Sequence, residues 1–114
     1  MSHETLALLQ GTADLLILQA LRHGPAHGYA VSRWVRERTE GALSMEDAAL
    51  YQALHRLEAR AWVASEWGLS ENNRRAKFYA LTPAGRKRLA RETKEWHQTA
   101  DLIAGFFAPR PEAS

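Results

Sequence analysis

The segment SMEDAALYQALHRLE, residues 44–58, decides the fold because it carries two different helix faces. Leu50, Leu54 and Leu57 recur three or four residues apart, which is typical of the buried side of a helix. The opposite side carries short or hydrogen-bonding side chains, namely Ala48, Gln52 and His55, with Ala49 and Arg56 on one flank and Tyr51 on the other. We therefore expect a helix that packs on a core with one face and can approach another molecule with the other. Ser44 and Asp47 have the spacing of a capping box at its start.

Two further helices are predicted before this segment. Thr12 is the expected N-cap of the first, and Gly24-Pro25 should end it because proline cannot continue the hydrogen-bond ladder. The second should run from about Ala26 to Arg38 and end at Glu40-Gly41. Its apolar residues recur at near-helical spacing, as Tyr29, Val31, Trp34 and Val35.

The texture changes after residue 61. Trp62–Gly68 and Ala76–Leu81 are rich in aromatic and branched residues and alternate in polarity, and the polar insert 69–74 between them favours a turn. Two antiparallel strands joined by a loop fit this pattern. Thr82-Pro83 then provides an N-cap and a proline at the first position of a last helix.

The last helix carries an apolar stripe of heptad type. Its members are Leu89, Thr93, Trp96, Ala100, Ile103 and Phe107. The stripe could pack within the chain, but a small domain with three helices and a hairpin has little core left for it, so we favour an interface with another chain. Leu6 and Leu9 lie at helical spacing in a short N-terminal arm that also needs a partner surface.

The order of elements predicts a mainly α fold with a small β-hairpin, namely a winged helix-turn-helix with a C-terminal dimerisation helix. We expect an arm at residues 1–11, the winged helix-turn-helix at 12–82, the dimerisation helix at 83–108 and a frayed tail at 109–114. The length of 114 residues suits a single core. The chain has no cysteine, which favours a reducing cytoplasm and excludes thiolate metal sites. No apolar run is long enough to cross a bilayer, and no signal peptide is expected.

Positive charge is concentrated in one part of the chain. Between Asn72 and Lys94 there are eight Lys and Arg residues, and Glu92 is the single acid. Such a segment is either a solvated helix face or a footprint for nucleic acid, whose phosphates Lys and Arg neutralise.

A nucleic-acid reading assigns a role to each exposed residue. The third helix would enter the major groove, and the basic hairpin would reach the backbone through Arg74, Arg75 and Lys77. Gln52 can pair with adenine, Arg56 with guanine or a phosphate, and Ala48 and Ala49 can meet a thymine methyl. His55 suits a phosphate or base contact. Tyr51 could donate to a phosphate or pack its ring at the edge of the core.

Three motifs in the expected order resemble the PadR family of bacterial transcriptional regulators. They are Gly28-Tyr29, residues 50–58 (LYQALHRLE) and residues 77–85 (KFYALTPAG). The resemblance implies a repressor or regulator that dimerises through its terminal helices and binds an inverted-repeat operator on double-stranded DNA. In some members a small planar hydrophobic effector enters near the dimer interface, which gives Trp96 two readings, interface packing or effector binding.

The chain departs from the family pattern at two positions. Relatives often have Gly where this chain has Ala48 and Ala61. Alanine in a left-handed cap costs about 1 kcal/mol relative to Gly, so either the turn at Ala61 has ordinary dihedral angles or some stability is lost.

Other function classes have little support. His23 and His27 are separated by Gly24-Pro25 and have no third ligand nearby, so we expect no metal and no cofactor. Ser44, Asp47 and His55 do not form a catalytic triad, and we expect no enzyme activity. The alternative is a winged-helix module that binds a partner protein and has no sequence-specific affinity for DNA.

Overall fold

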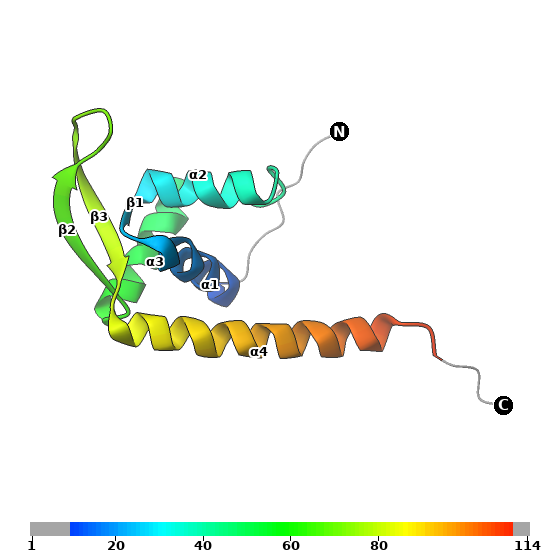
Figure 1. Cartoon of the computed structure of the whole chain (residues 1–114). Helices are drawn as coiled ribbons and strands as arrows, with labels where there is room; N and C mark the ends of the chain where they lie inside the picture. Colours follow the sequence, from blue (N-terminus) through cyan, green and yellow to red (C-terminus); the bar gives the residue numbers. More distant parts are fainter. Residues whose placement is uncertain (1–9, 111–114) are drawn as a thin grey trace.

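The computed structural model describes residues 10–110 (Figure 1). Its elements follow in the order α1 (Gln10–Ala20), the short 3-10 turn η1 (Leu21–His23), β1 (Ala26–His27), α2 (Gly28–Arg38), α3 (Asp47–Ala59), β2 (Val63–Leu69), β3 (Arg75–Leu81) and α4 (Pro83–Phe107). This is the predicted mainly helical winged helix-turn-helix with a long C-terminal helix. Leu6 and Leu9 of the predicted arm lie outside the described residues.

The core lies where the first three helices meet the sheet and the start of α4. Leu50, Leu54 and Leu57 of α3 are fully buried, as the leucine spacing predicted. They pack with buried residues from every other helix and from β2 and β3, including Ile17, Leu18, Leu21, Val31, Val63, Tyr79 and Leu89.

The sheet has three strands in the order β1-β3-β2, all antiparallel. The ribbon β2–β3 was predicted, and its register pairs Val63 with Leu81 and Leu69 with Arg75. The strand β1 was not predicted, because its two residues, Ala26 and His27, carry no strand pattern of their own and pair only with Tyr79 and Phe78 of β3.

Two helices begin with a side-chain cap. Thr82 Oγ1 accepts a hydrogen bond from the Gly85 amide at 2.9 Å, so the predicted start of α4 is confirmed. His27 Nδ1 accepts from the Ala30 amide at 3.2 Å and begins α2, two residues later than predicted.

Two other predicted caps are wrong. Thr12 lies inside α1, because that helix already includes Gln10. Ser44 does not cap α3, whose N-cap is Glu46 without a side-chain hydrogen bond. The capping-box spacing was present in the sequence, but the helix begins two residues beyond it.

The end of α3 answers the question that the sequence raised at Ala61. Ala61 has φ 62°, so the left-handed alternative holds. Its amide donates to the Glu58 carbonyl at 2.9 Å, and the Trp62 amide donates to the Leu57 carbonyl at 3.1 Å. These two bonds define a Schellman motif, in which glycine is the preferred residue.

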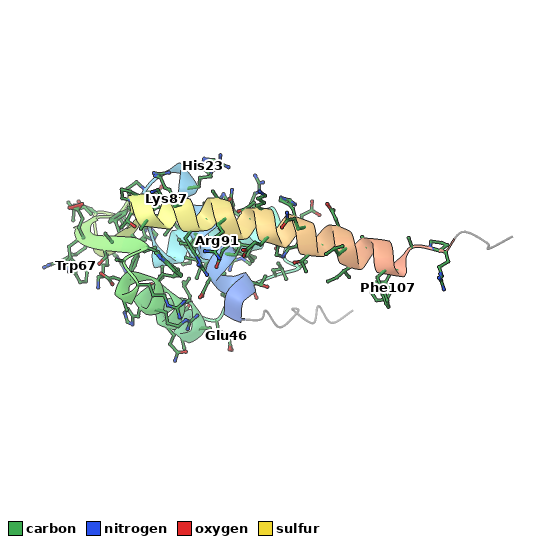
Figure 2. The ribbon with its side chains drawn as sticks, turned by 90° about the horizontal axis from the view of Figure 1, so that it is seen from below. His23, Glu46, Trp67, Lys87, Arg91 and Phe107 are labelled. Atoms are coloured by element: carbon green, nitrogen blue, oxygen red, sulfur yellow. The ribbon has the colours of Figure 1, made fainter. Side chains whose placement is uncertain are left out.

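The helix α4 is packed at its start and free of other elements further on (Figure 1). Leu89 is 6% exposed and belongs to the core, so its assignment to a dimer interface was wrong. Figure 2 looks onto α4 and shows Phe107 at its far end, beyond the other helices. Within residues 10–110, no helix is long and apolar enough to cross a membrane.

Candidate nucleic-acid interface

The outer face of α3 is a continuous exposed surface. Ala48, Ala49, Tyr51, Gln52 and His55 are all exposed, whereas the leucines of the same helix are buried. The prediction of two distinct faces is therefore confirmed. The side chains on the outer face are small or can form hydrogen bonds, which suits readout of base edges in a major groove.

Arg56 differs from its predicted neighbours on this face. Its Nη2 atom lies 2.8 Å from Oδ1 of Asp14 in α1, and the Asp14 side chain is only 11% exposed. A base or phosphate contact by Arg56 would require this ion pair to break or to be shared. The sequence did not predict the pair, because its two members are 42 residues apart.

Tyr51 packs against the beginning of α2. A Cβ atom placed on Gly28 would lie 2.6 Å from the Tyr51 hydroxyl oxygen and 2.8 Å from its ring, so only glycine fits at position 28. The Tyr51 side chain nevertheless stays 41% exposed. The structure thus contains the packing contact and leaves part of the ring open, and the predicted phosphate contact stays a prediction.

The ribbon β2–β3 carries the predicted basic residues. Arg74 and Arg75 are exposed, and the Arg75 guanidinium lies 4.7 Å from the ring centroid of Trp67 across the ribbon. Lys77 is half-buried, with Nζ 4.0 Å from Glu58 of α3. Ser65 of β2 donates a hydrogen bond to the same carboxylate at 2.5 Å, so Glu58 joins the ribbon to α3.

A hollow of about 560 Å³ lies between the ribbon, α2 and α3. Its lining includes the predicted residues Tyr51, His55, Arg74, Arg75 and Lys77, and three residues that the sequence reading did not assign to the site, Tyr29, Arg33 and Trp67. Tyr29 was expected on the buried side of its helix, but it is 57% exposed. Helical spacing alone could not separate Tyr29 from its buried neighbours, because it lies at the very start of α2.

Tyr79 forms the floor of the hollow. It is 2% exposed, and burial raises the pKa of its hydroxyl, with a further contribution from the negative charge of Glu58. The raised pKa keeps Tyr79 neutral, so it adds no negative charge beneath the cationic lining.

A second exposed surface covers the far part of α4. Trp96 and Ile103 are about half exposed, and Leu102, Phe106 and Phe107 are more than three-quarters exposed. The predicted stripe therefore becomes a surface from Trp96 onward, and Leu102 and Phe106 widen it beyond the prediction. Trp96 also borders an apolar hollow of about 290 Å³ between α1 and α4, lined by Leu15, Leu16, Leu43 and Thr93.

Three packed helices, a basic two-stranded wing and a protruding apolar helix define a winged-helix protein of the transcription-regulator class. The PadR-like family of transcriptional regulators matches residues 17–91, and the chain belongs to this family. A transcriptional regulator from Clostridium thermocellum is 31% identical, with a TM-score of 0.78 over 87% of this chain and 93% of that one. A PadR family transcription regulator from Clostridium difficile is 29% identical, with a TM-score of 0.76 over 86% of this chain and 100% of that one.

The chain also resembles part of a longer protein. It is 42% identical over 95 residues to a 37.1 kDa protein in a transposon of Streptomyces fradiae, and the match covers 83% of this chain but only 25% of that protein. The family assignment rests on residues 17–91, which include the outer face of α3 and the wing. It confirms the predicted resemblance and makes the chain a DNA-binding transcriptional regulator and not an enzyme.

Proposed function

We propose that the chain is a homodimeric repressor that binds an inverted-repeat operator. The observation that carries the proposal is the outer face of α3, exposed and free of large side chains except Tyr51. In a dimer, two copies of α3 would enter successive major grooves about 34 Å apart. Bound across a promoter, such a dimer blocks transcription.

Each exposed residue has a proposed contact. Gln52 pairs with adenine, Ala48 and Ala49 pack on thymine methyl groups, and His55 and Tyr51 reach a phosphate or a base edge. The wing residues Arg74, Arg75 and Lys77 hold the backbone, which fixes the register but carries no sequence information. Arg56 is left out of this set because Asp14 occupies its guanidinium.

The division between readout and backbone contacts can be tested by two variants. Gln52→Ala should lose about 1–3 kcal/mol at one base position and leave affinity for random duplex unchanged. Arg75→Ala should weaken binding to all duplexes alike and flatten the salt dependence. Gln98→Ala on the exposed side of α4 is a matched control for Gln52. Equal losses on cognate and random duplex for Gln52→Ala would contradict its role.

The exposed surface of α4 is the proposed dimer interface. Trp96, Ala100, Ile103 and Phe107 follow one stripe, and Thr93 lies half-buried at its inner end. Apolar surface of this kind on a protruding helix supports association with a second copy. Trp96→Asp should elute as a monomer in sizing chromatography, whereas Gln98→Asp, on the other side of the helix, should elute as wild type. An unchanged elution volume for Trp96→Asp would remove that residue from the interface.

Release by a small planar hydrophobic effector is the remaining part of the proposal. The apolar hollow beside Trp96 supports it, since it has a volume of about 290 Å³ and aliphatic walls. An aromatic ring could stack on the indole there. Titration with the dye 1-anilinonaphthalene-8-sulfonate should give a fluorescence increase that Trp96→Leu removes. Equal binding by both proteins would place the dye elsewhere.

A further inference from the structure

We infer that α2 and the wing form a second DNA-contact surface, in which Tyr29, Arg33 and Trp67 hold a DNA strand in the hollow beside α3. This inference rests on the proposed DNA-binding function and extends it to residues that neither α3 nor the cationic part of the wing supplies. The hollow has a volume of about 560 Å³ and is open toward the same side as the outer face of α3.

The charge of the lining favours a phosphate chain. Arg33 comes from α2, and Arg74, Arg75 and Lys77 come from the wing. Among the described residues that line the hollow, Glu71 is the one carboxylate. Arg33 has a carboxylate of its own helix nearby, with Glu37 at 3.9 Å, but both side chains are largely exposed, and such pairs are weak enough for a phosphate to replace.

The aromatic residues of the hollow are held in place and remain open to solvent. Tyr29 and Trp67 are each 57% exposed. The Arg33 guanidinium lies 5.7 Å from the ring of Tyr29, and that of Arg75 lies 4.7 Å from the ring of Trp67. Each aromatic ring is therefore a platform that orients one guanidinium, and its free edge can contact a deoxyribose.

The position of the hollow makes it part of any path between the two proposed contacts. Its lining contains Tyr51 and His55 of α3 on one side and Arg74 and Arg75 of the wing on the other. A strand that contacts both α3 and the wing has to cross the space between them. Tyr29 and Arg33 stand at the edge of that space, on α2.

This geometry assigns Arg33 as a direct phosphate contact and Trp67 as a positioning residue that acts through Arg75. Both should set affinity for DNA and leave base preference unchanged, because phosphates are the same at every sequence. The two roles differ in their dependence on salt, since only the loss of a phosphate contact changes the number of counterions released.

The test measures binding of the full chain to a fluorescent duplex by anisotropy at several salt concentrations. Arg33→Ala should weaken binding about 10-fold on cognate and random duplex alike, as expected for one charge-assisted hydrogen bond. The slope of log K against log salt should become shallower by about 0.9, the value for one phosphate. Arg36→Ala is the matched control, because Arg36 is an exposed arginine of the same helix that does not line the hollow.

The wing is tested by substitutions of Trp67. Trp67→Ala should weaken binding about 3-fold, as expected for the loss of one cation–π contact, with little change in the salt slope. Trp67→Phe should restore most of the affinity because a ring remains under Arg75. Leu69→Ala, on the same strand and outside the hollow, should bind as wild type.

Two results would overturn the inference. One is an Arg33→Ala protein with wild-type affinity and slope. The other is an equal loss for Arg33→Ala and Arg36→Ala, which would reflect long-range electrostatics without contact. Neither result affects the proposed function, which would fail instead if the wild-type chain showed no preference among duplexes.

Discussion

Arg56 Nη2 lies 2.8 Å from Asp14 Oδ1, so an ion pair ties the proposed recognition helix α3 to α1. The Asp14 side chain is 11% exposed and that of Arg56 is 32% exposed, which places the pair at the edge of the core. The Arg56 Nε atom is buried without a hydrogen-bond partner among the described residues, so the guanidinium depends on Asp14 for its interactions. The pair therefore fixes the orientation of α3 relative to α1.

A double-mutant cycle measures the strength of this pair. Asp14→Ala and Arg56→Ala should each lower the free energy of unfolding, and the coupling energy between them should be about 1–3 kcal/mol, as for other charged hydrogen bonds near the core. Urea denaturation of the two single variants and the double variant gives the value. Additive effects, with no coupling, would show that Arg56 is free to serve the interface.

The left-handed residue at the end of α3 offers a stabilising substitution. Ala61 has φ 62°, a conformation that costs an L-residue about 1 kcal/mol more than glycine. Ala61→Gly should therefore raise the free energy of unfolding by about 0.5–1 kcal/mol. Ala59→Gly, two residues earlier inside the helix, is the control and should lower it by a similar amount. Destabilisation by both substitutions would mean that Ala61 is not strained.

Gly85 is required by a close approach between α4 and the end of α3. A Cβ atom at this position would lie 1.9 Å from the Trp62 carbonyl oxygen, which the backbone cannot accommodate without a shift. Gly85→Ala should lower the free energy of unfolding by about 2–3 kcal/mol. Gly105→Ala, in the same helix with no atom within 4 Å of the added carbon, should be neutral or stabilising. A tolerated Gly85→Ala would contradict the observed packing of α4.

Burial of Tyr79 makes stability depend on alkaline pH. Its pKa is raised by burial and by Glu58, so the folded chain holds this proton more tightly than the unfolded chain. The resulting stability is complete below about pH 10 and is lost as the pH rises toward the folded pKa. Wild type should therefore lose stability relative to Tyr79→Phe between about pH 9 and 11. Parallel pH profiles of the two proteins in urea denaturation would contradict this.

Much of the fold follows from local sequence. The leucines of α3 at three- and four-residue spacing, the Thr82-Pro83 start of α4 and the alternation in the ribbon each contain the physical cause of the structure within a few residues. The outer face of α3 could be predicted for the same reason, since a helix with a known buried side has a known exposed side.

The remaining features depend on contacts between distant segments. The strand β1 exists because Ala26 and His27 pair with Tyr79 and Phe78, and the Asp14–Arg56 pair joins positions 42 residues apart. Leu89 continues the heptad spacing of the stripe, but the core of its own chain covers it. Tyr29 and Trp67 resemble core residues in sequence, and only the fold shows that they line the hollow.

Selection of bound duplexes from a randomised pool by the purified chain tests the central claim most directly. We predict enrichment of an inverted repeat whose half-sites lie about 10 base pairs apart, with a preference at one position that Gln52→Ala removes. A pool that remains random after selection at low salt would contradict the account and would favour a module that binds a partner protein.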